Sequence, residues 1–188
     1  MNGYITPFTS EYIGLADNFK VNPKFCGGNN YFERYIKDGA LEEQNRGECV
    51  THVFLKIDDN NQAQDIIGYI TLRASSLNIR GHKADFGAFP AIEIMAIAIN
   101  SNYEKQGFGR MLLNYTINVA DKLRRNYTGI EYVITCADGN AVGFYSKCNF
   151  NKCIDYYKIP NRQKMKKFMR NVSKPYNVDM YLKLPKLD

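Results

Sequence analysis

Tryptophan is absent from the 188-residue sequence, histidine occurs only as His52 and His82, and no two cysteines form a CxxC pair. This shortage of imidazoles and paired thiols argues against a zinc site or a histidine-rich centre, so we predict no metal. The five cysteines are an odd number and favour reduced thiols, as is typical of a cytoplasmic protein. Cys136 and Cys148 are interpreted as buried small hydrophobic residues, because neither has a neighbouring histidine that would favour a nucleophile.

Long apolar runs are also missing from the chain. No run approaches the ~18 to 20 residues that cross a bilayer. The segment Met1–Thr9 lacks the basic-then-apolar pattern of a secretory signal. We therefore expect no membrane segment and a cytoplasmic location. The length and the average composition, 45% hydrophobic and 23% charged, predict one globular domain over residues 1–188.

The net charge of +6 is concentrated in one late segment. Lys158–Lys174 holds seven basic residues and no acidic one, so this segment carries the whole positive surplus. The segment is a candidate surface for binding anions. Met165, Phe168 and Met169 have helical spacing within it, so a helix that covers a sheet or meets a partner is an open alternative.

Hydrophobic spacing predicts an alternation of helices and strands. A helix is expected over Asn29–Leu41, followed by a hairpin of Val50–Ile57 and Ile66–Leu72 joined at Asp58–Gln62. Ser75–Phe89 is expected to be a loop.

The second half of the chain contains the most apolar strand. Pro90 opens this strand, Ala91–Ile99, which is interrupted only by Glu93. The other expected elements are a helix from Phe108 to about Arg125, a strand over Ile130–Cys136, a helix over Asn140–Cys148 ended by a left-handed Asn149, and a strand over Tyr176–Leu184. The pattern predicts an α/β or α+β sandwich with a mixed, mostly antiparallel sheet flanked by helices.

The segment Glu104-Lys105-Gln106-Gly107-Phe108-Gly109-Arg110 joins the apolar strand to the strongest helix. Main-chain N–H groups at a helix N-terminus can bind a pyrophosphate, and glycine permits its close approach. An ordinary strand-to-helix turn is the alternative interpretation of the two glycines.

Several short motifs together carry a family resemblance. They are Ile97-Ala98-Ile99, Tyr103, the Glu104–Arg110 loop, Leu112-Leu113, Asn140 and Phe144-Tyr145-(x4)-Phe150. Over Ala91–Phe150 the sequence resembles the GNAT N-acetyltransferase superfamily. Glu104 stands where that family usually has Gln or Arg, and Asn149 stands in place of a glycine.

The resemblance implies the acyl-CoA N-acyltransferase fold, with acetyl-CoA between two splayed parallel strands that end near Ile99 and Cys136. The pantetheine arm would pair with the main chain of Ile97, Ala98 and Ile99, and the amides from Lys105 to Arg110 would hold the diphosphate. The implied coenzyme-binding residues are Ile97, Ala98, Ile99, Glu104, Lys105, Gln106, Gly107, Phe108, Gly109, Arg110, Asn140 and Phe144. Asn140 has the alternative role of capping the helix that follows it.

Transfer of an acetyl group to an amine requires proton movements at the amine and at the sulfur. The resemblance places Tyr145 near the sulfur, and a phenol there can act as general acid. Glu93 is the only charge in its strand and is a candidate general base, acting through water. The alternatives are a core tyrosine packed beside Phe144 and a glutamate in an ion pair or in solvent; some members of the family use no base.

Phe25–Asn29, the following helix through Ala40, and Gly68–Leu72 resemble the GNAT toxins of toxin–antitoxin pairs. This resemblance implies acetylation of the α-amine of aminoacyl-tRNA, tRNA binding through Lys158–Lys174, and a ribbon-helix-helix antitoxin as partner. Alternatives are an acetyltransferase for a small amine, a peptide N-terminus or a protein lysine, and a non-enzymatic acyl-CoA-binding module suggested by Glu104. Homodimerisation is common in the family, but the sequence locates no interface.

Overall fold

A computed structural model of the chain describes residues 2–23, 30–78, 88–153 and 177–187. The described strands form one sheet in the order β1-β2-β3-β4-β5-β7-β6. The strands are β1 (Gly3–Pro7), β2 (Val50–Ile57), β3 (Ala63–Leu77), β4 (Phe89–Ile99), β5 (Tyr132–Ala137), β6 (Asn151–Lys152) and β7 (Val178–Lys183). The helices are η1 (Ser10–Tyr12), α1 (Ile13–Ala16), α2 (Tyr31–Arg34), the π-helix η3 (Tyr35–Gly39), α3 (Ala40–Asn45), η4 (Ser101–Tyr103), α4 (Phe108–Asn126) and α5 (Val142–Lys147).

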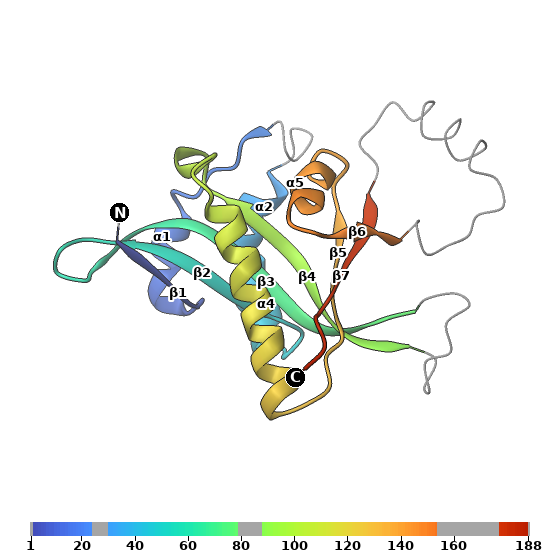
Figure 1. The fold of residues 1–188 in the computed structure, drawn as a ribbon. Coiled ribbons are helices and arrows are strands. Elements are labelled where there is room, and N and C mark those ends of the chain that lie inside the picture. The colour runs from blue at the N-terminus through green and yellow to red at the C-terminus, as the bar shows by residue number, and fades with distance from the viewer. Residues whose placement is uncertain (1, 24–29, 79–87, 154–176, 188) are drawn as a thin grey trace.

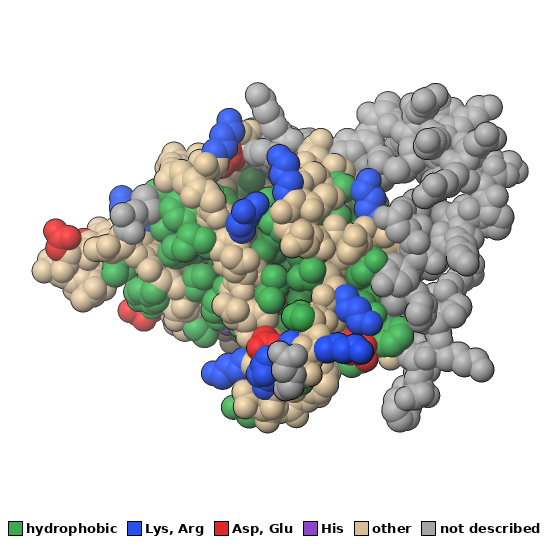
Figure 2. Space-filling model, viewed as in Figure 1, with side chains coloured by type: hydrophobic (Ala, Val, Ile, Leu, Met, Phe, Trp, Pro, Cys, Tyr) green, Lys and Arg blue, Asp and Glu red, His purple; other side chains and the backbone are tan. Residues whose placement is uncertain are grey.

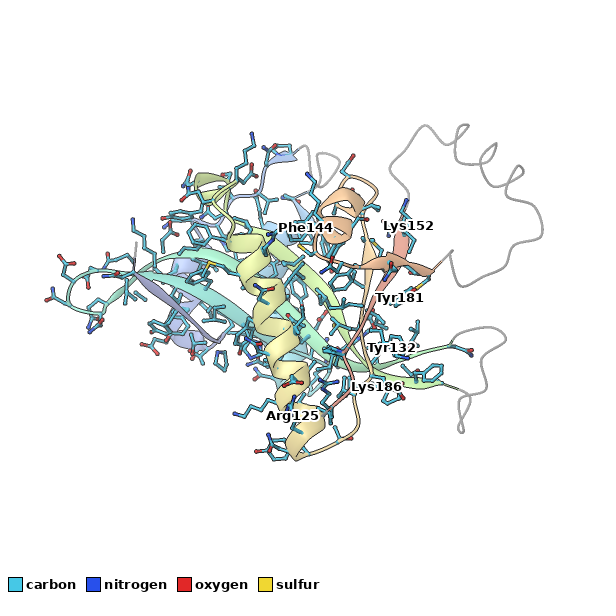
Figure 3. All side chains as sticks on the ribbon, viewed as in Figure 1. Arg125, Tyr132, Phe144, Lys152, Tyr181 and Lys186 are labelled. Carbon is cyan, nitrogen blue, oxygen red and sulfur yellow. The ribbon has the colours of Figure 1, made fainter. Side chains whose placement is uncertain are left out.

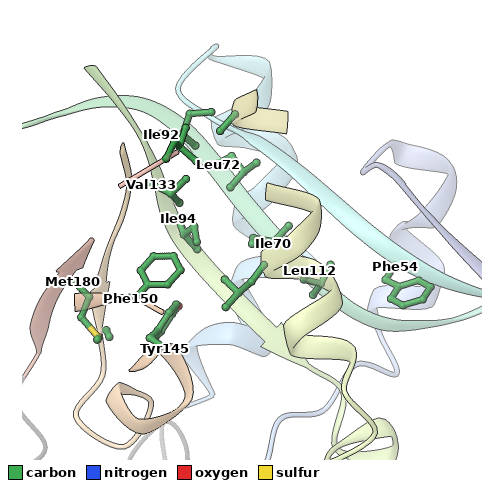
Figure 4. Packing of buried hydrophobic residues seen from close by; sticks show 14 of the residues in the cluster. Phe54, Ile70, Leu72, Ile92, Ile94, Leu112, Val133, Tyr145, Phe150 and Met180 are labelled. Atoms are coloured by element: carbon green, nitrogen blue, oxygen red, sulfur yellow. The ribbon is translucent and has the colours of Figure 1, made fainter. Parts of the chain in front are cut away.

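Helices cover the two faces of the sheet separately (Figure 1). On one face, α4 and α5 enclose a core that contains Ile70, Leu112 and Tyr145, part of which is drawn in Figure 4. On the other face, the helices α1 to α3 enclose a second core that contains Ile36 and Tyr69. The apolar stripe of α4 therefore packs as its 3.6-residue period predicts.

Strands β4 and β5 are the only parallel neighbours in the described sheet. Their pairing ends at Ile94 and Thr135, although β4 continues to Ile99 and β5 to Ala137. The two strands separate beyond this point, as Figure 1 shows where β4 and β5 diverge. The expected splayed parallel strands of an α+β sandwich are confirmed.

A bulge in β4 lies directly at the start of this split. Thr71 pairs with Ala96 and Leu72 with Ile94, so Met95 is an extra residue. Because side chains alternate along a strand, the extra residue reverses which face later side chains occupy. Ile94 packs in the core under α4, whereas Ala96 packs in the core on the opposite face.

The structure corrects several sequence-based boundaries. The expected loop over Ser75–Phe89 is wrong at both ends, because Ser76 pairs with Pro90 and Leu77 pairs with Phe89. Pro90 therefore does not open β4. The expected helix over Asn29–Leu41 is interrupted by η3 and extends to Asn45, and β1 was not expected. The segments Phe25–Asn29 and Lys158–Lys174 lie outside the described residues.

The four described cysteines carry free thiols, and Cys26 lies outside the described residues. The prediction that Cys136 and Cys148 are buried is wrong: Cys136 is exposed and Cys148 is only half-buried. Cys136 is on the solvent-facing side of β5, because its neighbours Val133 and Ala137 pack in the core under α4. Among the described helices, none is sufficiently long and apolar to cross a membrane.

Candidate active site

The loop between β4 and α4 has the backbone shape of an anion site. Lys105 and Gly107 adopt left-handed conformations, with φ of 60° and 88°. The first α-helical bond is the one that Met111 N–H donates to Gly107 O, at 3.2 Å. The main-chain N–H groups of residues 105–110, which precede this bond, have no main-chain acceptor within the described residues. These N–H groups and the positive end of the α4 dipole lie together at the top of the helix.

Gly109 brings the loop into contact with α5. A Cβ at Gly109 would lie 3.2 Å from the Phe144 ring, which is tighter than an ordinary contact. Figure 3 shows Phe144 between α5 and the first turns of α4. The absence of a side chain at Gly109 therefore lets α5 pack closely against the loop.

The Tyr145 ring is 3% exposed and lies between Phe144 and Phe150, with ring centroids 5.2 and 5.3 Å away. Its hydroxyl lies near the side chain of Thr135, the last β5 residue paired with β4, whose own hydroxyl donates a hydrogen bond to Ile94 O at 3.1 Å. Burial raises the pKa of Tyr145 to about 12, against the smaller opposing effect of Thr135. The phenol is therefore protonated at neutral pH and sits where the two strands begin to separate.

Glu93 lies one residue before the end of the β4–β5 pairing, on the face opposite α4. Its carboxylate accepts hydrogen bonds from Arg73 Nε at 2.9 Å and Ser75 Oγ at 3.1 Å. Glu93 raises the pKa of the Arg73 guanidinium, chiefly through this hydrogen bond. The structure thus places the candidate base in a surface ion pair.

Cys136 and Asp179 lie on the same face as Glu93, across the split. They are Cα partners on β5 and β7. Partial burial of the sulfur and the nearby carboxylates of Asp179 and Glu93 raise the pKa of Cys136 to about 11. Cys136 is therefore a protonated thiol at neutral pH and a weak nucleophile.

A hollow of about 260 Å³ lies between α4 and α5, beside the loop. Its wall includes the basic residues Arg110 and Lys147 and the amides Asn114 and Asn149. Asn149 is left-handed, with a φ of 67°, as the sequence predicted. Figure 2 shows basic side chains over this face of the molecule. The hollow therefore offers cations and amide donors to an anionic group next to the loop.

A short segment of the N-terminal half contacts the loop region from the other side. Lys20 O accepts a hydrogen bond from Ser101 N–H at 2.7 Å, and Asn22 Nδ2 donates to Glu104 at 3.3 Å. Between them, Val21 N–H donates to Glu33 of α2 at 2.9 Å. Glu104, which replaces a Gln or Arg of the resembling family, thus binds to the chain's own N-terminal half.

The structure brings most of the predicted site residues together around the split. Ile97, Ala98 and Ile99 form the separated half of β4, and the loop residues Glu104, Lys105, Gln106, Gly107, Phe108, Gly109 and Arg110 follow it. Asn140 precedes α5, where Ala141 and not Asn140 stands at the N-cap. Arg73 and Thr135 were not singled out from the sequence. The strand register could have found Arg73, which is the Cα partner of Glu93.

The sequence profile of the acetyltransferase (GNAT) family matches residues 22–150. The chain belongs to the GNAT acetyltransferase family. The match ends at Phe150 and includes the loop, the split strands and Tyr145 of this acetyltransferase.

Solved structures resemble this GNAT acetyltransferase over most of its length. A bacterial toxin is 18% identical with a TM-score of 0.68, covering 97% of this chain and 90% of its own. AtaT complexed with acetyl-methionyl-tRNAfMet is 14% identical with a TM-score of 0.67, covering 80% and 88%. A mutant AtaT toxin bound to the C-terminus of the antitoxin AtaR and acetyl-CoA is 15% identical with a TM-score of 0.65, covering 97% and 94%. At these identities the likeness establishes the fold, which is that of GNAT toxins.

Proposed function

We propose that this protein is an acetyl-CoA-dependent N-acetyltransferase of the toxin type, acting on the α-amine of aminoacyl-tRNA. The observation that carries the proposal is the end of the β4–β5 pairing at Thr135, beside which the protonated Tyr145 hydroxyl lies. The gap between the two strands can hold a thioester and the attacking amine side by side, next to a buried proton donor.

The residues present fit acetyl-CoA, which supplies the acetyl group as a reactive thioester. The unpaired amides of the loop, reached across the open surface at Gly107, would hold the diphosphate. The main chain of Ile97–Ile99 has no β5 partner and would pair with the pantetheine arm. Arg110 and Lys147 would bind the phosphate of the adenosine end.

Tyr145 would act on the departing sulfur. A thiol has an ordinary pKa of ~8.5, lower than that of this buried phenol, so complete proton transfer to the sulfur is uphill. Tyr145 would therefore donate a hydrogen bond that stabilises the negative charge developing on the sulfur, without giving up its proton completely. The proton that finally neutralises the sulfur would come from the acetylated amine.

Transfer would be direct from acetyl-CoA to the amine. The exposed Cys136 thiol at the split is protonated at neutral pH, which disfavours an acetylated cysteine as an intermediate carrier. Glu93, on the same face, would accept through a water molecule the first proton, which the α-ammonium group loses before it attacks; the second proton, lost after the attack, would go to the sulfur. The ion pair of Glu93 with Arg73 would hold the carboxylate in a fixed orientation.

The proposed acceptor is supported by similar solved structures and by the charge of one segment. AtaT, whose fold this chain shares, is known in complex with acetyl-methionyl-tRNAfMet and with the antitoxin AtaR. The basic segment Lys158–Lys174 of this chain offers charges for an RNA backbone. We accordingly propose tRNA as substrate, an antitoxin as partner and the cytoplasm as location.

The testing experiment measures CoA release from acetyl-CoA with a thiol reagent. One arm contains bulk charged tRNA, a second the same tRNA after deacylation, and a third a panel of amines and peptides. Release with charged tRNA is expected to be much faster than in the other two arms. Release only with small amines or peptides would retain the acetyltransferase and reject the RNA acceptor. Absence of release in every arm, together with no binding of acetyl-CoA at millimolar concentration, would reject the enzyme.

A further inference from the structure

The face opposite α4 is the route left to the acceptor, because the proposed coenzyme occupies the side of α4 and α5. On this face the separated half of β4 is adjacent to α2 and η3. Tyr69, the Cα partner of Ala98 on β4, donates a hydrogen bond to Phe32 O of α2 at 2.9 Å. Tyr35 of η3 packs against the Tyr69 ring at 6.2 Å. The α2–η3 helices therefore lie next to the strand on which the thioester would be held.

A hollow of about 310 Å³ opens on these helices, lined by Tyr31, Arg34, Tyr35, Asp38, Gly39 and Glu42. The Tyr31 ring stacks on the Tyr35 ring, with centroids 5.9 Å apart and planes inclined by 22°. Tyr35 is buried, whereas Tyr31 remains 51% exposed. A buried tyrosine thus supports a second, accessible one as a rigid aromatic platform.

The backbone of η3 creates this arrangement. A π-helix widens the helical turn and is frequently found at functional sites. A Cβ at Gly39 would lie 3.2 Å from the Tyr35 ring, so glycine leaves the room that the ring occupies. Glu43 fixes the other end of Tyr35, accepting a hydrogen bond from its hydroxyl at 2.8 Å.

The lining groups match a planar base better than a phosphate. An exposed tyrosine face and an arginine plane are surfaces on which nucleobases stack. Asp38 is an acceptor for the exocyclic amine of such a base, whereas Glu42 is paired with Arg46 at 2.7 Å. The charges around the hollow therefore cancel and leave no positive surplus for a phosphate. The ligand that fits is therefore a neutral heteroaromatic ring with N–H donors.

We infer that this hollow binds the terminal nucleobase of the acceptor RNA, stacked on Tyr31. The inference rests on the proposed function. In an aminoacyl-nucleoside the amine and the base are carried by one ribose. A base held on α2 would consequently keep the amine on the face that α2 covers, beside the separated half of β4. Tyr31 is thus a specificity residue that distinguishes aminoacyl-RNA from free amines.

The test compares acceptors with and without the base. The unmodified protein, Tyr31→Ala, Tyr31→Phe and the control Tyr127→Ala are assayed with bulk charged tRNA, with 3′-aminoacylamino-3′-deoxyadenosines, and with the corresponding amino-acid amides. Tyr127 is a matched control because it is 75% exposed at the end of α4, away from this hollow. Circular dichroism and thermal unfolding verify that each variant is folded.

For Tyr31→Ala the KM of the two adenosine-bearing acceptors should rise roughly tenfold, the usual effect of losing one stacked base. Tyr31→Phe should retain the lower KM, and the values for the amides should not change. An equal change with the amides, or no change with charged tRNA, would overturn the inference while leaving the RNA acceptor in place. Acetylation of amides alone by the unmodified protein would reject the RNA acceptor and the inference together.

Discussion

The Tyr145 hydroxyl lies beside Thr135, the last residue of β5 that pairs with β4. Tyr145 comes from α5 and Thr135 from the sheet, so the helix packs at the closed end of the split. Phe144 and Phe150 enclose the ring and exclude water from it. The proposed proton donor is therefore held in place by packing.

Tyr145→Phe should lower kcat by roughly 10²-fold, because it removes only the hydrogen-bond donor and retains the ring. The dissociation constant for acetyl-CoA, measured by calorimetry, should change less than about twofold, since the proposed coenzyme contacts lie elsewhere. Tyr127→Phe serves as the exposed control. Unchanged turnover with an accepted substrate would remove Tyr145 from the chemistry.

Glu93→Gln should lower kcat/KM at neutral pH by at least roughly tenfold, because an α-amine with an ordinary pKa of ~7.7 to 8.0 is then largely protonated. The defect should shrink as the pH rises, when the amine loses its proton to solvent. A pH profile of kcat/KM measures this.

Arg73→Gln is the matched control for Glu93→Gln. It breaks the same ion pair but retains the carboxylate, and an exposed pair contributes only ~0 to 1 kcal/mol of stability. If the two variants gave the same profile at every pH, Glu93 would be a structural partner of Arg73 and not a base.

Gly107→Ala should destabilise the fold by about 1 kcal/mol, because its φ of 88° is unfavourable for a residue with a Cβ. It should also weaken acetyl-CoA binding roughly several-fold, because it would shift the amides of the loop. Urea unfolding and calorimetry measure the two effects. The helical Gly143→Ala, where a Cβ would meet nothing within 4 Å, should not be destabilising and should bind normally. Equal behaviour of the two variants would contradict a special role for the loop.

His52 should make stability depend on pH. Its Nδ1 is the one buried side-chain nitrogen or oxygen in the described part without a hydrogen-bond partner, and burial lowers its pKa. The unfolded chain therefore binds a proton more readily, at an ordinary pKa of ~6.5. The contribution of His52 to the free energy of unfolding should be fully present above that pH. It should be lost as the pH falls towards the lower pKa of the folded state, by at most about 1.4 kcal/mol per pH unit.

His52→Phe removes the titrating group and retains a ring against Tyr115, 5.1 Å away in the unmodified protein. Its free energy of unfolding should change less between pH 7 and pH 5 than that of the unmodified protein. Identical slopes for the two proteins would show that other groups control the acid response.

Periodicity was sufficient to predict α4 and the central strands, because their apolar residues repeat at the spacing that the cores require. It failed where tertiary contacts decide the structure. β1 contains Gly3 and Pro7, which are poor strand formers, and depends on pairing with β2. The π-helix at Tyr35–Gly39 retains a helical pattern in sequence, so no local signal distinguishes it from an α-helix.

The site shows the same division. The loop glycines and Tyr145 were predicted from motifs, and the structure brings both to the split. The ion pair of Glu93 with Arg73 depends on a cross-strand register that the separate segments do not specify. Cys136 was expected to be buried because it has no neighbouring histidine that would favour a nucleophile, but strand alternation turns it outward.

The hydrogen bonds of Lys20, Val21 and Asn22 tie the segment after β4 to α2. One edge of the proposed coenzyme site and one edge of the proposed acceptor site are thus parts of the same small hydrogen-bonded unit. A displacement of Glu104 when acetyl-CoA binds would be transmitted to α2 through these hydrogen bonds and would change the affinity for the acceptor. Binding of the acceptor at α2 would change the affinity for acetyl-CoA by the same factor, because linkage between two sites is reciprocal. The two substrates would therefore meet as coupled ligands, with the affinity for one set in part by the presence of the other.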